Sequence, residues 1–297
     1  MSSPERSEAI ELQRRVQRLE AAARRNLSGM VSSQFASRLR GQGLLYEESR
    51  RYVHGDPARR IDWNVTARLG EPFVKVHLDE RRRPIVLVVD ISPSMKVGFS
   101  GRSKLETAVE IAATLAVSIL AAGDHVGLLL FADRLVEVVP AGGGRRQLHR
   151  LLASLLRHAS GGRDRISHSD PRVAIRALEE GQKQRSLVYF LSDFFDHDVA
   201  EDLRYLRARH RVTLIRIEDP GEALLAGGPV RFLGASPEGE LAARRVGGKA
   251  PDSQIGEREA RLLRVARSRA IGWLEASTAE SVPALLARHF HRRRRAP

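Results

Sequence analysis

Three oxygen-bearing side chains stand close together after an apolar run of the sequence. Asp90, Ser92 and Ser94 follow residues 85–89 in the order Asp-x-Ser-x-Ser. Side chains two residues apart on an extended segment point to the same side, so the carboxylate and both hydroxyls can converge on one point. Three hard oxygen donors suit Mg²⁺, which takes oxygen ligands in an octahedron and keeps several waters. Alone, the motif fits equally well a strand-end turn whose serine caps the next segment.

A second carboxylate stands after another apolar run. Asp193 lies two positions beyond residues 187–191. Parallel strands of one sheet end at the same edge, and α/β sheets bind their ligands at this edge. We therefore expect the carboxylates of Asp90 and Asp193 at one strand-end site, which would bind either a metal ion or a partner.

The segments that carry these residues belong to a regular alternation of strands and helices. Short apolar runs predict strands over 85–89, 126–131, 187–191 and 212–217, with a hairpin strand over 135–139. Helical periodicity predicts helices over 105–120, 147–156, 171–180 and 199–209. This alternation predicts parallel pairing with right-handed crossovers, and hence an α/β fold in which helices cover both faces of a mostly parallel sheet.

The chain divides into four regions. They are an amphipathic N-terminal helix (1–27), a loop-rich β module (28–83), the α/β domain (84–220), and hairpin pieces with C-terminal helices and a basic tail (221–297). The apolar stripe of the first helix predicts that it packs on its own domain. Helices are expected over 252–275 and 282–290. In the β module, Trp63 is expected to anchor the module on the α/β core, with direct contact to a partner as the alternative.

Composition excludes several classes of protein. The 297 residues include no cysteine, so disulfides, thiolate nucleophiles, Cys-ligated zinc and iron–sulfur clusters are excluded. The longest uncharged apolar stretch, 111–123, is shorter than the ~20 residues of a membrane-spanning helix. The first 25 residues are rich in Glu and Arg and lack the apolar segment of a secretion signal. We expect a soluble, cytoplasmic protein.

The net charge of the chain says less about its partners than the composition says about its class. The formal net charge is +14, and nearly all of the basic residues are arginines. Arginine forks suit carboxylates and phosphates, so an acidic protein and a nucleic acid are both compatible with this charge. Aromatic residues make up only 5% of the chain and form no evident stacking platform, which counts against nucleic acid.

The sequence carries no recognisable catalytic motif. It lacks the Gly-x-Ser-x-Gly elbow, the Walker motif and His-Glu-x-x-His, and its ten histidines are scattered. Asp193, Asp196 and Asp198 form an acidic cluster that leaves a metal-dependent hydrolase as a weak alternative. We expect a binding protein and not an enzyme.

Two sets of residues resemble known families. Residues 90–94, 123–127 and 191–193 resemble a von Willebrand factor type A domain with its metal-ion-dependent adhesion site. Residues 55–68, which read GDPARRIDWNVTAR, resemble the signature of the bacterial domain of unknown function 58 family. The combined resemblance covers about residues 28–220.

The resemblance implies a function in binding. Members of this family resemble von Willebrand A proteins that accompany MoxR-type AAA+ ATPases as adaptors or cochaperone-like partners. Four of the five metal-site positions match, at Asp90, Ser92, Ser94 and Asp193. At the fifth position, where such domains usually have threonine, this chain has Arg163. The resemblance therefore implies a degenerate site that binds Mg²⁺ weakly or not at all, and makes all five residues candidates for contact with the partner.

Overall fold

The computed structural model describes most of the chain. The described residues are 3–28, 48–53, 61, 63–76, 84–99, 101–159, 166–182, 184–194, 199–224, 230–232, 243–245, 252–268 and 270–292. Arg163, Asp196, Asp198 and the basic C-terminal tail, which the sequence analysis singled out, lie outside them.

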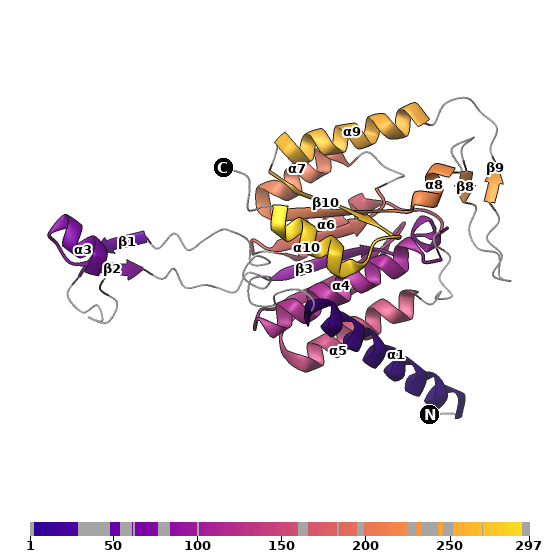
Figure 1. Ribbon diagram of the computed structural model, residues 1–297, viewed down its shortest axis with the longest axis horizontal. Helices are drawn as coiled ribbons and strands as arrows, with labels where there is room; N and C mark the ends of the chain where they lie inside the picture. Colours follow the sequence, from indigo (N-terminus) through magenta and orange to yellow (C-terminus); the bar gives the residue numbers. More distant parts are fainter. Residues whose placement is uncertain are drawn as a thin grey trace.

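A six-stranded sheet forms the centre of the molecule, with its strands in the order β10, β7, β6, β3, β4, β5. The strands are β3 (Ile85–Asp90), β4 (Val126–Phe131), β5 (Leu135–Gly142), β6 (Leu187–Ser192), β7 (Arg211–Glu218) and β10 (Gly272–Ser277). Neighbouring strands pair in parallel except β4 and β5, which pair antiparallel. The predicted α/β sandwich around a mostly parallel sheet is confirmed (Figure 1).

Helices cover both faces of this sheet. One face carries α1 (Ser3–Ser28), α4 (Lys104–Ala121), α5 (Gly144–Ala159) and α10 (Val282–Arg292); the other carries α6 (Pro171–Gly181), α7 (Ala200–Arg209) and α9 (Asp252–Ser268). Successive residues of β3 point into two separate apolar cores, Leu87 into the first and Val88 into the second. Because both faces are covered, β3 is apolar at every position before Asp90.

The N-terminal helix α1 packs on the sandwich, as its apolar stripe predicted. Val16 and Ala23 are buried in the core that α4 and α5 share. The amide of Asn26 donates to Glu110 Oε1 of α4 at 2.8 Å, which fixes the C-terminal end of α1. α1 is therefore part of the domain.

The β module consists of β1 (Glu48–Arg51), α3 (Trp63–Leu69) and β2 (Phe73–Val76), with β1 and β2 antiparallel. In Figure 1 it lies apart from the sandwich. Trp63 is 69% exposed, so the prediction that it anchors the module on the α/β core is wrong. Among the described residues, neither the two-stranded sheet and seven-residue helix of this module nor the sandwich encloses the indole ring.

The C-terminal part differs from the sequence prediction at one element. A helix was expected over 252–275, but α9 ends at Ser268 and residues 272–277 form β10, an edge strand parallel to β7. Leu274 and Ala276 are buried and Glu275 between them is exposed, which is the period of two that a half-covered strand requires. The final helix, α10, agrees with the prediction.

The remaining elements are short. They are the 3-10 helix η2 (Pro93–Lys96), α8 (Pro220–Leu224), and the antiparallel strands β8 (Val230–Phe232) and β9 (Ala243–Arg245). Among the described helices, none has the length and apolar character required to cross a membrane.

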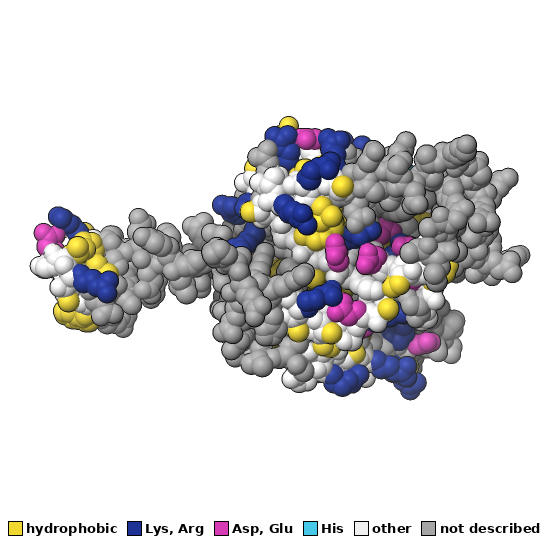
Figure 2. Space-filling model, turned by 45° about the horizontal axis from the view of Figure 1, so that its top comes forward, with side chains coloured by type: hydrophobic (Ala, Val, Ile, Leu, Met, Phe, Trp, Pro, Cys, Tyr) yellow, Lys and Arg dark blue, Asp and Glu magenta, His cyan; other side chains and the backbone are white. Residues whose placement is uncertain are grey.

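Basic side chains are distributed over the surface. On the face shown in Figure 2, Lys and Arg side chains lie in several separate groups among acidic, apolar and uncharged ones. Among the described residues of this face, the arginines therefore do not form the continuous basic stripe that follows a nucleic-acid backbone.

Candidate functional site

The site is centred on a carboxylate at the end of the central strand. Asp90 is the last residue of β3, and its side chain is completely buried. Its Oδ1 accepts a hydrogen bond from the backbone N–H of Ser92 at 2.9 Å. Its Oδ2 accepts two more, from the hydroxyls of Ser192 and Ser169, each at 2.7 Å. Three donors from three segments of the chain thus hold one buried carboxylate in place.

The surroundings of Asp90 disfavour its ionised form. Burial raises the pKa of this carboxyl, and the nearby negative charge of Asp193 raises it further. The hydrogen bonds from Ser169, Ser192 and Ser92 lower it, but the net result is a rise from 3.8 to about 6. A buried carboxyl group whose surroundings raise its pKa is typical of a functional site and unusual in a purely structural core.

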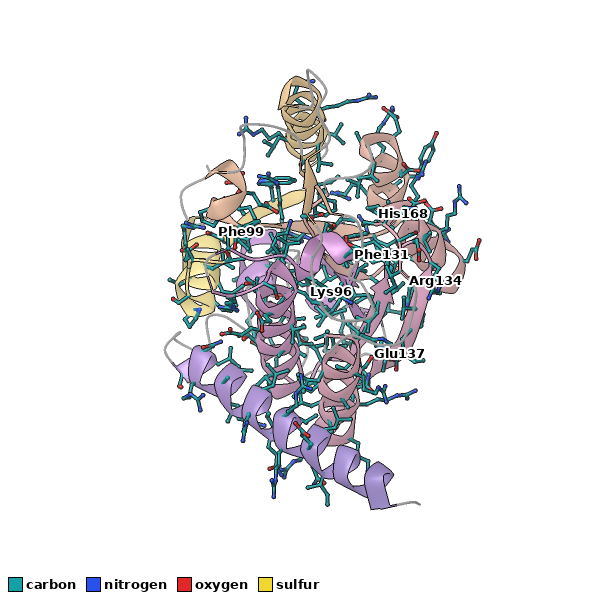
Figure 3. The ribbon with its side chains drawn as sticks, turned by 90° about the vertical axis from the view of Figure 1, so that its right-hand side faces the viewer. Lys96, Phe99, Phe131, Arg134, Glu137 and His168 are labelled. Carbon is teal, nitrogen blue, oxygen red and sulfur yellow. The ribbon has the colours of Figure 1, made fainter. Side chains whose placement is uncertain are left out.

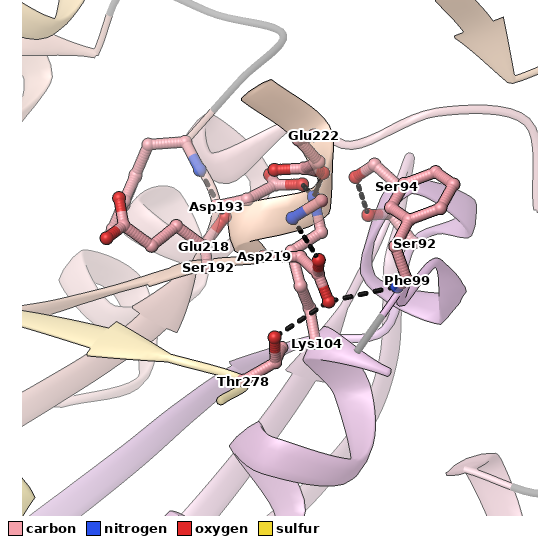
Figure 4. A network of polar contacts seen from close by, with 12 residues as sticks. Ser92, Ser94, Phe99, Lys104, Ser192, Asp193, Glu218, Asp219, Glu222 and Thr278 are labelled. Carbon is pink, nitrogen blue, oxygen red and sulfur yellow. Dashed lines mark hydrogen bonds and ion pairs between the residues drawn. The ribbon is translucent and has the colours of Figure 1, made fainter. Parts of the chain in front are cut away.

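Two serine hydroxyls lie together beside this carboxylate, at the start of η2. The Oγ atoms of Ser92 and Ser94 are 3.1 Å apart (Figure 4). Neighbouring oxygen ligands of Mg²⁺ at 2.0–2.1 Å from the ion would be about 3 Å apart, so this pair alone fits two corners of an octahedron. Ser92 is fully buried and Ser94 is partly exposed.

The second predicted carboxylate, that of Asp193, forms an ion pair with a lysine. Asp193 Oδ2 accepts from Lys104 Nζ at 2.8 Å, and the same ammonium group donates to Glu222 Oε1 on α8 at 2.5 Å (Figure 4). Lys104 is the first residue of α4 and is only 2% exposed. Burial by itself lowers the pKa of Lys104, but the two carboxylates outweigh it and the pKa lies above its ordinary value. Lys104 is therefore a buried cation at the strand ends.

A third carboxylate fixes the rim of the site. Asp219 Oδ2 accepts from the backbone N–H of Phe99 at 3.0 Å and from the hydroxyl of Thr278 at 2.7 Å, and Oδ1 accepts from the backbone N–H of Gly221 at 2.7 Å (Figure 4). Gly221 has no room for a side chain, since an added Cβ would lie 2.2 Å from the Cβ of Phe99. These contacts tie the loop after η2 to the ends of β7 and β10.

The accessible part of the site is a rim of larger side chains. Phe99 is 46% exposed although its backbone is fixed. Figure 3 looks onto the strand-end face and shows Lys96 between Phe99 on one side and Arg134 and His168 on the other. Arg134 forms an ion pair with Asp133 at 3.0 Å. The face thus exposes an aromatic ring and cationic groups around a buried polar centre.

The structure brings together most of the residues that the sequence analysis selected. Asp90, Ser92 and Ser94 converge, and Asp193 is close enough to act on Asp90 electrostatically. Asp90 and Ser92 are completely buried and Asp193 is buried as well, so these three candidates for contact with a partner do not lie on the surface. After β3 the chain turns directly into η2, in which the N–H of Met95 donates to the carbonyl of Ser92 at 3.1 Å.

Three participants were missed from the sequence. Ser192, the last residue of β6, lies beside Asp90 because β6 and β3 are parallel neighbours in register. Ser169 is held there because the next residue, Asp170, donates its backbone N–H to the carbonyl of Ala132 after β4. Lys104 is the third. The parallel register was a usable signal for Ser192, whereas nothing local in the sequence indicates where Ser169 lies.

The residues present do not suit a divalent cation as a set. The two hydroxyls have a suitable spacing, but both oxygens of Asp90 accept hydrogen bonds from protein donors and Asp193 is paired with Lys104. Within the described part of the chain, no group of three or more His, Asp or Glu side chains is arranged to hold a metal ion. We therefore derive no function that depends on a metal.

Comparison with known protein families and sequences gives one consistent result. A family model described as "Protein of unknown function DUF58" matches residues 48–248. The uncharacterized proteins Mb1516 of Mycobacterium bovis and Rv1480 of Mycobacterium tuberculosis are each 32% identical to this chain over 211 residues, which is 70% of it. The matched part spans 65% of each relative, just under two thirds of their length.

Solved structures resemble the chain more distantly. The conserved hypothetical protein BatB from Bacteroides thetaiotaomicron is 14% identical with a TM-score of 0.45, and the match covers 72% of this chain and 100% of that one. An aerotolerance-related membrane protein from Bacteroides fragilis is 15% identical with a TM-score of 0.44, and the match covers 71% and 99% of the two chains.

Proposed function

The chain belongs to the DUF58 family of proteins of unknown function, and on this basis we propose that it is a non-enzymatic, cytoplasmic binding module for a MoxR-type AAA+ ATPase. In this proposal the sandwich is a von Willebrand A-like domain, and its partner binds at the strand ends of the sheet. The partner class comes from the family resemblance of residues 55–68 and 90–94.

The buried carboxylate of Asp90 is the observation that best supports a binding function at the strand-end edge of the sheet. The fold holds it at the end of the central strand with a pKa raised to about 6, because burial and then the charge of Asp193 disfavour ionisation. Such an arrangement lowers stability at neutral pH, and natural proteins retain groups of this kind mainly at functional sites. The edge itself is where α/β sheets bind their ligands.

The polar centre supports binding better than catalysis. The hydroxyls of Ser169 and Ser192 both donate to the Asp90 carboxylate and hold it in place, which is a positioning role. Since Asp90 and Ser92 are buried, they position η2 and the following loop and do not touch the partner directly. In this proposal the residues of the rim contact the partner. Among them, Phe99 is an exposed aromatic side chain of the kind that dominates the binding energy of protein interfaces.

Capture of partners from the bacterium that encodes the chain tests this proposal. Tagged wild-type protein should retain a MoxR-type AAA+ ATPase identified by mass spectrometry, and Phe99→Ser should lose it. Tyr205→Ser is the matched control, because Tyr205 is a 70% exposed aromatic on α7, outside the contacts that form the site. Equal capture by wild type and Phe99→Ser would place the interface elsewhere. Capture of nucleic acid instead, with a steep loss at higher salt, would contradict the proposed partner class.

A further inference from the structure

We infer that the ammonium group of Lys104 is the resident cation of the strand-end site and takes the place of a divalent metal ion there. Its Nζ lies 2.8 Å from Asp193 Oδ2 and 2.5 Å from Glu222 Oε1. Both contacts are ion pairs, and the one to Asp193 has the length of a charge-assisted hydrogen bond. The inference concerns only residues of this chain and does not depend on the identity of the partner.

The position of Lys104 is fixed by the helix that it begins. Ser103 is the N-cap of α4, and a capping box joins its side chain and backbone to Glu106. The N–H of Lys104 donates to the carbonyl of Val97 at 3.0 Å, which ties the start of α4 to the loop after η2. The fixed backbone of Lys104 thus positions its ammonium group beside Asp193.

Burial of Lys104 makes this pairing obligatory. The side chain is 2% exposed, and Asp193 is itself buried, with 5% of its side chain exposed. An isolated charge is very unfavourable at such a depth, so each of these two groups requires the other. Glu222 is 35% exposed and supplies a second acceptor from α8. The ammonium is therefore an integral part of the site.

A divalent ion at the two serine hydroxyls would compete with this arrangement. It would share the field of Asp193 with a buried ammonium group, and like charges in a buried site repel strongly. Asp90, the other carboxylate of the site, already accepts three hydrogen bonds from protein donors. The cation that the structure places beside Asp193 is Lys104, whereas Arg163 lies outside the described residues.

Calorimetric titration of the full chain with MgCl₂ tests the inference directly. Wild type should show no saturable binding below the millimolar range. Lys104→Gln removes the charge but keeps a hydrogen-bond donor for Asp193, and it should gain at least about tenfold in Mg²⁺ affinity, with a Mg²⁺-dependent rise in melting temperature. Adding Asp90→Asn to this variant should remove the gain.

Two controls separate the site from general charge effects. Lys104→Arg keeps the positive charge and should bind Mg²⁺ no better than wild type. Lys96→Gln removes one positive charge from the partly exposed rim, where solvent screens it, and should change Mg²⁺ affinity by no more than about twofold.

Two results would overturn the inference. One is micromolar Mg²⁺ binding by the wild type, and the other is a folded Lys104→Gln protein with no gain in affinity. If Lys104→Gln fails to fold, the ¹³C signal of the Asp193 carboxyl carbon in the wild type decides the question. It should stay unchanged at submillimolar Mg²⁺ because Lys104 keeps its place, and a saturable shift there would refute the inference.

Discussion

Replacing Asp90 by asparagine should stabilise the protein increasingly as the pH rises. Asparagine has nearly the same shape, and its side-chain oxygen can still accept from the N–H of Ser92, while its amide can donate to the hydroxyls of Ser169 and Ser192. What the variant loses is the negative charge that burial and Asp193 disfavour.

The size of the effect follows from the raised pKa. Between pH 3.8 and about 6, the folded protein keeps the proton of Asp90 while the unfolded chain releases it. Folding therefore takes up a proton in this range, and the free energy of unfolding of the wild type falls as the pH rises. At 1.36 kcal/mol per pKa unit the full shift is worth about 3 kcal/mol, and the wild type loses about 2.4 kcal/mol of this relative to Asp90→Asn between about pH 4 and pH 8.

Urea denaturation of both proteins across this range provides the measurement. The difference in unfolding free energy, variant minus wild type, should increase by about 2.4 kcal/mol from about pH 4 to about pH 8 and level off above it. A constant penalty from the amide shifts the whole curve without changing this increase. Glu11→Gln, which removes an exposed carboxyl on α1, should not reproduce it. A flat difference for Asp90→Asn would refute the electrostatic description of the site.

Three further outcomes are expected. Trp63→Ala should change the unfolding free energy by no more than about 0.5 kcal/mol, since the ring is 69% exposed; a loss of several kcal/mol in urea denaturation would show that the ring is buried after all. Asp219→Ala should cost about 2–4 kcal/mol in the same assay, because it removes the carboxylate that accepts one buried and two partly buried hydrogen bonds. A neutral result would contradict the role of Asp219 in fixing the rim. Ser169→Ala should raise the pKa of Asp90 further above about 6 in an NMR titration, because it removes a hydrogen bond that favours the carboxylate, and an unchanged or lower pKa would contradict that contact.

The fold of the α/β domain was largely predictable because its signals are local. Strands buried on both faces are continuous apolar runs, as in β3 and β4, and the helices between them repeat with helical period. The prediction failed at β10, where a short period-two pattern directly follows the helix α9 in sequence. It also failed for Trp63, because the exposure of a side chain depends on which distant segment covers it.

The site was predictable only where strand ends determine it. Asp90, Ser92 and Ser94 follow one strand, so their convergence is a local property of the chain. Lys104 reaches Asp193 across 89 positions of sequence, and Ser169 reaches Asp90 across 79, so only the folded chain identifies these pairs. The burial of Asp90 was missed for the same reason, since Ser169 and Ser192, which contact its carboxylate, come from distant segments of the chain.

The affinity of purified wild-type protein for the MoxR-type AAA+ ATPase of the same bacterium, measured beside Phe99→Ser and Tyr205→Ser, tests the proposed function most directly. Wild type and Tyr205→Ser should bind with equal affinity, and Phe99→Ser should bind at least about tenfold more weakly, as expected when an exposed aromatic anchor is removed from an interface. No binding by the wild type, or an equal loss for both variants, would contradict a partner site at the strand ends of the sheet.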